Sequence, residues 1–314
     1  MHPGNNPKDT ETGQNQTAAS VHRLYPMTSS TGPRLPEPDK PFQARLSLNF
    51  QLDGGKTRLV GRDHFGPLLV QKPFYPEGSD MCQAVIIHPP GGVVGGDRLE
   101  LAVKVGRSAN AQITTPGAAK WYKANGHVSR QGIKLDIGAG GALEWVPQET
   151  IFFDNVHVDL DHQVLLEKEA SYIGCEILCF GRTASGESFT NGQIGQRTSI
   201  RRDGKLVWFE QIRLQGGSSA MKNPLGLGGH TICATLIAVG KPVSAELLNE
   251  AREGAAEISG GSGHFGISQL ASLVVARYLG NSSETARRIM LNSWGLIRPV
   301  MLGREAMVPR MWNT

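Results

Sequence analysis

The residues best suited to chemistry in this chain are four carboxylates in glycine-rich or apolar surroundings, together with one histidine. They are Asp97, Glu149, Asp154 and Glu187, with His88 as a candidate nitrogen donor. Isolated carboxylates and water bind a divalent cation reversibly, whereas a closed cage of cysteine and histidine retains it. These residues are our candidates for a transient metal path, and Asp97 and Glu187 rank first because glycine or serine flanks each of them.

Asp97 follows two glycine pairs in the segment HPPGGVVGGDRL, residues 88–99. The spacing of the glycines fits neither GxGxxG nor GxxxxGK[ST], and Asp97 would repel a phosphate. A nucleotide cradle is therefore excluded here. A loop that ends in a carboxylate favours a cation, or else Asp97 caps the backbone amides of a tight double turn between strands.

The segment LEWVPQETIFFD, residues 143–154, places Glu144, Glu149 and Asp154 among aromatic and aliphatic side chains. Carboxylates are costly to bury unless they are paired or bind a metal. Strand alternation would instead direct each one to solvent, and we expect this for Glu144.

A further segment, GRTASGESF at residues 181–189, contains Arg182, Ser185 and Glu187. No glycine precedes Ser185 by two positions, so the segment does not match the nucleophile elbow of serine hydrolases. We expect Arg182 to be a structural partner for a carboxylate.

The cysteines and histidines lack the spacing of a closed metal site. The nine histidines form no HExxH motif and the four cysteines form no CxxC pair. Cys175 and Cys179 could share one face and ligate a metal, although buried structural thiols explain them as well. Because the N-terminus does not resemble a signal peptide, we expect reduced thiols and a cytoplasmic location.

Composition favours a turn-rich β protein. The chain has 39 glycines and 18 prolines among 314 residues, and only 19% of its residues are charged. The net charge of +4 is too small to indicate nucleic-acid binding, and no apolar run is long enough to span a membrane. The charges fall in two blocks, basic in residues 98–134 and acidic in residues 136–176, which suit either protein docking and cation handling or two solvated faces.

The sequence divides into an N-terminal arm and a β-rich body. Residues 1–41 hold seven of the 18 prolines and few apolar residues, so we expect a disordered arm. Residues 42–314 form a single domain in which apolar and polar residues alternate, first in QARLSLNFQL, which a DGG turn joins to KTRLV. Further strands are expected around residues 99–105, 133–137, 143–145, 156–160, 172–180 and 205–214, with no helical pattern between them.

Helical periodicity appears only near the C-terminus. One stretch presents Leu247, Leu248 and Ala251 on one face after Ser244, a candidate N-cap. A second begins at Asn281 and Glu284, which have the spacing of a capping box. Between them, LASLVVARYLG is expected to be a buried strand.

Six segments together resemble the UreD family of urease accessory proteins, also called UreH. They are LVQKPFYPEG (69–78), HPPGGVVGGDRL (88–99), TTPGAAKWYK (114–123), LEWVPQETIFFD (143–154), GRTASGESF (181–189) and LIRPVMLGREAMVPRMW (296–312). They occur in the family's order, and the resemblance covers residues 42–313. It implies a mainly β fold, a β-helix-like stack of short strands with about two α-helices near the C-terminus.

The resemblance also implies a role without catalysis. A UreD-like protein is a nickel-insertion chaperone that binds apo-urease and the protein UreF, which recruits the GTPase UreG. Ni²⁺ released on GTP hydrolysis passes through UreF and UreD to the carbamylated lysine of urease. We therefore expect no tightly bound cofactor, Ni²⁺ in transit, and a dimeric state within the accessory complex.

Two other functions fit the residues. A β-helical carbohydrate-active enzyme could use Glu149 and Asp154 as an acid/base pair, although aromatic residues make up only 6% of the chain. A pure adaptor could join urease to the GTPase complex without contacting nickel.

Overall fold

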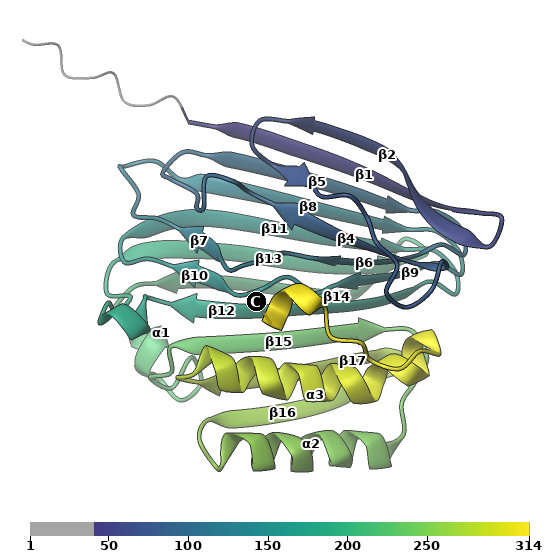
Figure 1. The fold of residues 1–314 in the computed structure, drawn as a ribbon. Coiled ribbons are helices and arrows are strands. Elements are labelled where there is room, and N and C mark those ends of the chain that lie inside the picture. Colours follow the sequence, from purple (N-terminus) through teal and green to yellow (C-terminus); the bar gives the residue numbers. More distant parts are fainter. Residues whose placement is uncertain (1–40, 314) are drawn as a thin grey trace, which may run out of the picture. The chain divides into compact units, whose positions relative to one another are not determined.

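The fold consists of two β-sheets that face each other, and the chain alternates between them (Figure 1). The computed structural model describes residues 41–313. The arm expected over residues 1–41 lies outside the described residues except for Pro41. The chain passes from β5 and β8 in one sheet to β6 and β9 in the other, so that each turn adds one strand to each sheet. This β-solenoid-like stacking, with long helices only near the C-terminus, confirms the predicted fold class.

The first sheet has seven strands. In spatial order they are β14 (Lys205–Gln215), β13 (Gly192–Arg202), β11 (Val156–Leu166), β8 (Ser129–Ile137), β5 (Arg98–Val105), β1 (Gln43–Asp53) and β2 (Lys56–Phe65). The strands from β1 to β13 pair in parallel, whereas β2 and β14 close the two ends in antiparallel fashion. The predicted DGG turn joins β1 to β2, and Gly54 and Gly55 both have positive φ there.

The second sheet has ten strands. Its main path runs through β16 (His264–Leu270), β17 (Leu273–Gly280), β15 (Ile232–Val239), β12 (Ser171–Phe180), β9 (Ala142–Trp145), β6 (Asn110–Thr114), β4 (Met81–Ile87) and β3 (Leu69–Val70). The short strands β7 (Ala119–Trp121) and β10 (Thr150–Phe152) pair beside this path. Strands β4, β6, β9 and β12 are parallel, like the centre of the first sheet.

Two neighbouring turns of the solenoid have a break in the second sheet, at the same position along the strand direction. Residues 115–118 separate β6 from β7, and residues 146–149 separate β9 from β10. The neighbouring β12 is continuous and pairs with β9 through its first residues and with β10 through its last. Only the middle of β12, around Glu176, faces the gap, and this leaves room between the sheets at that level.

The interior between the sheets is mostly apolar. Alternating residues of β1 and β5, such as Leu46, Phe50 and Val103, point inward and are almost fully buried. The inward residues of β8 and β11, including Leu135 and Val164, continue the same core. Burying these side chains is the main source of stability, at about 25 cal/mol per Å² of apolar surface removed from water.

Two long helices cover the outer face of the ten-stranded sheet. Helix α2 spans Ala245–Ser259 and helix α3 spans Ser283–Leu302, and they pack against each other and against β12, β15, β16 and β17 (Figure 1). The four-residue helix α1, Ser219–Lys222, follows β14. The Ser244 hydroxyl accepts a hydrogen bond from the Leu247 amide, as predicted for this N-cap.

Two local predictions were wrong. The N-cap of α3 is Ser282, whose hydroxyl accepts from the Thr285 amide, while Asn281 instead accepts from the Thr231 amide. Glu144 does not face solvent: its side chain is completely buried because α3 covers the outer face of β9. The alternation of residue types along one strand could not show that a helix 150 residues later in the sequence supplies hydrogen-bond partners for the Glu144 carboxylate.

Candidate functional site

Four of the six sequence motifs come together as stacked loops at one edge of the solenoid. The Val93 amide donates to the Lys120 carbonyl, and the Tyr122 amide donates to the Val93 carbonyl. On the next two turns of the solenoid, the Phe153 amide donates to the Trp121 carbonyl and the Gly181 amide donates to the Phe152 carbonyl. Segments 88–99, 114–123, 143–154 and 181–189 thus follow one another along the edge.

A cavity of about 350 Å³ lies between the two sheets, at the level where β6–β7 and β9–β10 are interrupted. Its walls come from the interrupted segments, the inner faces of β5 and β8, and the loop of residues 88–93. Most of the lining is apolar or backbone. Its side chains that could ligate a metal are His88, at the end of β4, and Glu176, on β12.

His88 is half-buried at the wall of this cavity. Burial lowers the pKa of its imidazole, and the nearby Asp97 carboxylate opposes this effect only in part. The imidazole is therefore neutral near pH 7, which is the form that binds a metal ion.

Glu176 of β12 is the second of these side chains at the cavity wall. One carboxylate oxygen accepts a hydrogen bond of 2.7 Å from Gln196 Nε2, and the other lies 3.8 Å from His162 Nδ1. His162 is itself buried between Trp145 and Tyr172. The Glu176 carboxylate thus lies inside the solenoid, with Gln196 and His162 on one side and the cavity on the other.

Asp97 is buried beside this site, but its oxygens are occupied. They accept hydrogen bonds from the Phe42 amide (2.8 Å) and the Val94 amide (3.0 Å). The carboxylate thus fastens the start of β1 to the glycine-rich turn, as the capping alternative proposed. Asp97 affects the cavity indirectly, because its negative charge raises the pKa of the His88 imidazole and so opposes the effect of burial.

Asp154 and Glu187 lie close together in the last two of the stacked loops, segments 143–154 and 181–189. Asp154 accepts hydrogen bonds of 2.7 Å from both the Thr190 and the Asn191 amide. Although burial pushes the other way, these bonds hold the pKa of Asp154 below its ordinary value. Glu187 forms a two-point ion pair with Arg182 (2.8 and 3.3 Å), which lowers the pKa of Glu187. The expected partnership of Arg182 with a carboxylate is confirmed.

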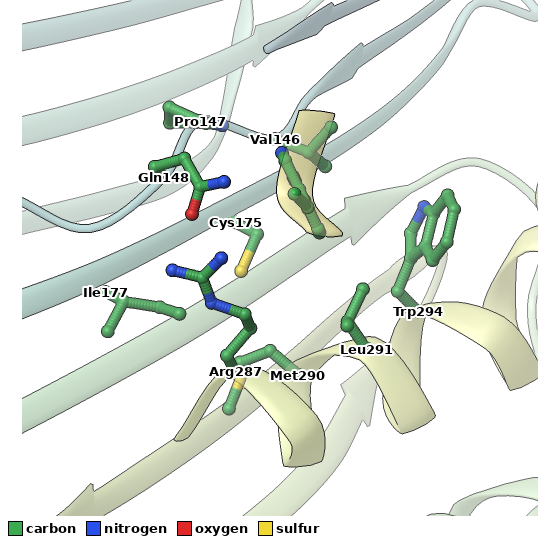
Figure 2. A pocket seen from close by; sticks show the side chains of 10 residues that line it. Val146, Pro147, Gln148, Cys175, Ile177, Arg287, Met290, Leu291 and Trp294 are labelled. Atoms are coloured by element: carbon green, nitrogen blue, oxygen red, sulfur yellow. The ribbon is translucent and has the colours of Figure 1, made fainter. Parts of the chain in front are cut away.

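Glu149 lies apart from the other four candidates. It is buried and forms an ion pair with Arg287 of α3, on the outer side of the ten-stranded sheet. Figure 2 shows Arg287 rising from α3 toward Cys175 and Gln148 around a small apolar pocket. This pocket measures about 20 Å³, roughly enough for one water molecule, and is a packing gap. Since Glu149 and Asp154 are held by separate partners, the geometry gives no support to an acid/base pair.

Comparison with known proteins assigns the family. Residues 43–313 match the family model described as UreD urease accessory protein. The chain is 60% identical over 276 residues to the urease accessory protein UreD of Nitrosospira multiformis, covering 88% of this chain and 99% of that protein. It is 57% identical over 272 residues to the UreD protein of a Janthinobacterium species, covering 87% of this chain and 92% of that protein. The chain belongs to the UreD family.

In this UreD-family chain, sequence reasoning missed Glu176. The residue stands in the strand segment YIGCEILCF, where a single carboxylate interrupts an apolar run. This was the available signal, because a charge is rarely placed in such a run unless it has a partner or a function. Alternation alone could not show which sheet face it occupies or that the neighbouring strands are broken beside it.

Among residues 41–313, no three His, Cys, Asp or Glu side chains are grouped so that they could hold a metal ion. The cysteines are free thiols, and burial raises the pKa of Cys175 and Cys179 to about 12, so they are poor ligands near neutral pH. No helix within these residues has the length and apolar character needed to cross a membrane.

Proposed function

We propose that this protein serves urease maturation as a nickel-insertion chaperone. It binds apo-urease and the UreF–UreG complex in the cytoplasm, as a dimeric assembly, and helps Ni²⁺ pass into the urease active site during GTP-dependent maturation. Membership of the UreD family supports the role in maturation. The observation that supports passage of the ion is the cavity lined by His88 and Glu176.

The chemistry of the cavity suits an ion that must both enter and leave. One neutral imidazole and one carboxylate, completed by water, bind a divalent cation less tightly than four protein ligands would. Each water takes up about 30 Å³, so a cation with six waters needs roughly 180 Å³. A cavity of about 350 Å³ accommodates such an ion without stripping its water.

The proposal is tested by co-expressing apo-urease, UreF and UreG with and without this chain and measuring nickel bound per urease. We expect nickel content and urease activity to rise several-fold when the chain is present. Equal nickel loading in both arms would disprove the chaperone role.

Variants separate a chaperone that contacts nickel from a pure adaptor. His88→Ala and Glu176→Gln should lower nickel per urease while the complex still co-purifies, and Glu253→Gln, on the exposed face of α2, is the matched control. Asp97→Ala and Glu187→Ala test the two carboxylates ranked first from sequence. If all four variants load nickel normally, the adaptor function is correct.

A further inference from the structure

The seven-stranded sheet ends in a long strand whose outer edge has no neighbour among residues 41–313. Strand β14 has eleven residues and pairs only with β13. Within this part of the chain, residues 205–214 form no backbone hydrogen bond outside the ladder with β13. Their outward amides and carbonyls are therefore available to a further strand, which could add to the sheet by main-chain hydrogen bonds.

The other three ends of the two strand paths are short or tied to another segment. The Thr57 amide of β2 donates to the Ser79 carbonyl in the loop before β4. Strand β3 has only two residues. On β16, the Arg252 guanidinium of α2 donates a hydrogen bond of 2.8 Å to the Ile267 carbonyl. Natural sheets protect their edges in such ways against unwanted pairing, so the open edge of β14 is a candidate interface.

Strand β14 also exposes three large apolar side chains within four residues. The exposed fraction is 49% for Leu206, 40% for Val207 and 53% for Phe209. The register with β13 places Leu206 and Phe209 on the outer face of the sheet, and the β-bulge between them accommodates Val207 as an extra residue. Apolar side chains gathered beside an open strand edge are typical of a surface that binds another protein.

The same strand has one charge of each sign on its inner face. The register with β13 places Lys205 and Glu210 on the face of the fully buried Ile200. Glu210 pairs with Arg277 through Oε1, and its side chain is still 21% exposed. Among the described residues, Lys205 has no carboxylate partner and Glu210 Oε2 accepts no hydrogen bond. Each charge can therefore still take a partner from outside the chain.

The segment KLVWFE, residues 205–210, is complementary to itself when two copies run in opposite directions. In an antiparallel pair of strands, opposed residues share one face of the sheet. A two-fold axis at the centre of the segment places Leu206 opposite Phe209 on the outer face. The same axis places Lys205 opposite Glu210 on the inner face. An axis through Glu210 would instead oppose two carboxylates, so charge and apolar contact favour the same register.

We propose that β14 pairs with β14 of a second copy of this chain, antiparallel and around a two-fold axis at the centre of residues 205–210. The two seven-stranded sheets then become one continuous sheet. Because a standard interface uses roughly 20–30 residues a side, this contact is weak by itself and depends on concentration. It becomes stronger where other proteins hold two copies together. The proposal rests on the proposed function only for the presence of two copies in one assembly.

Cysteine cross-linking of the full chain, alone and co-expressed with UreF and UreG, tests the register. An equimolar mixture of Leu206→Cys and Phe209→Cys should give a disulfide-linked dimer with the oxidant diamide, because opposed Cα atoms lie about 4.5–5.5 Å apart. Either variant alone places its two thiols three residues apart along the strands, roughly 10 Å, and should stay monomeric. The native cysteines, which are buried or half-buried, provide the wild-type background. Linkage of one variant to itself, or no linkage in the mixture, would overturn the proposal.

Sedimentation of the full chain over a range of concentrations measures the association itself. Phe209→Lys places two added positive charges close to the axis and should weaken self-association at least tenfold. Phe65→Lys is the matched control, since Phe65 is 58% exposed and lies on β2 at the other end of the same sheet. Equal weakening by both variants would indicate unspecific apolar association and contradict the proposal. Cross-linking of Leu206→Cys to UreF or UreG would assign the edge to a partner's strand and also contradict it.

Nickel per urease in the co-expressed complex separates this proposal from the function on which it rests. If the cysteine mixture fails to link while the wild-type chain still raises nickel loading, the β14 contact is wrong and the chaperone function stands. If omission of the chain leaves nickel loading unchanged, the chaperone function is wrong, and the cross-linking result still decides whether two copies meet at β14.

Discussion

A fully buried Arg298 organises the contact between α3 and the solenoid. Its guanidinium contacts both oxygens of Glu144 at 2.9–3.1 Å and also pairs with Glu77 at 2.7 Å. Trp294, one turn earlier on α3, donates a hydrogen bond of 2.7 Å to the same Glu144 carboxylate. A buried ion pair adds little net stability, but removal of one partner leaves a charge in the core.

We therefore expect Arg298→Met to destabilise the fold by about 3–5 kcal/mol, the usual cost of breaking a buried pair. Urea unfolding of the purified protein or complex measures this change. Arg288→Met, on the exposed side of the same helix, is the control and should change stability by less than about 0.5 kcal/mol. A loss below about 1 kcal/mol for Arg298→Met would contradict a role of Arg298 in compensating a buried charge.

Asp154 should contribute to the dependence of stability on pH. Because backbone hydrogen bonds hold its folded pKa below the unfolded value of about 4, its stabilising effect is fully present above that pH. The effect is lost as the pH falls through the folded pKa. Asp154→Asn should reduce the loss of stability between pH 7 and pH 3, by less than about 1 kcal/mol because solvent partly screens the side chain. Unfolding curves at the two pH values would contradict this if variant and wild type lose equal stability.

At the scale of elements, alternation identified strands such as β1, β5, β8 and β11 because one face of each is buried, but it did not identify β4, β6, β13 or β15. A continuous apolar run located β17, and helical periodicity located both long helices, because their apolar faces are local in sequence. These patterns could not give the breaks between β6 and β7 or β9 and β10, since a gap depends on the strands stacked on either side. The cavity and the place of Glu176 at its wall therefore could not be predicted from the sequence, whereas His88 could be proposed from its own segment.

The predicted start of α3 was wrong by one residue. Ser282, not Asn281, accepts the hydrogen bond from the first turn. Ser282→Ala should destabilise the protein by about 1 kcal/mol, the typical value for loss of an N-cap. Ser283→Ala, one residue inside the helix, is the control and should be neutral or slightly stabilising, since alanine favours helix. Equal losses for the two variants would contradict the assignment of Ser282 as the cap.

At the scale of the whole molecule, the basic block supplies β8 and the acidic block supplies β11, which are neighbours in the seven-stranded sheet, while each block also supplies strands of the ten-stranded sheet. Arg130 of β8, in the basic block, lies 3.9 Å from Asp159 of β11, in the acidic block. Asp161 of β11 pairs at 2.8 Å with Arg197 of β13, which lies outside both blocks. Acidic side chains of β11 are thus paired with basic side chains on both neighbouring strands, which agrees with a solvated face. Their proximity could not be read from the sequence, because parallel pairing brings together residues that are about 30 positions apart.

The motif loops form a continuous column through four turns of the solenoid. Gly92 lies against the Tyr122 ring, Tyr122 packs edge-on against Phe153 at 4.8 Å, and Arg182 covers Phe153 at 4.3 Å. Gly92 is required because a Cβ atom there would overlap the Tyr122 ring. The column explains why segments far apart in the sequence form one edge beside the cavity.

Gly92→Ala should displace the column and destabilise the protein by about 1–3 kcal/mol, the cost of overpacking. Gly117→Ala is the control, because a Cβ atom there meets nothing within 4 Å. Since Tyr122→Ala removes the ring that blocks the new methyl group, the effects of Gly92→Ala and Tyr122→Ala should be less than additive in a double-mutant cycle. The melting temperatures of the four proteins measure this coupling, and nickel loading of co-expressed urease shows whether the displaced edge also affects the cavity. Strict additivity of the two substitutions would mean that the loops at this edge adjust independently.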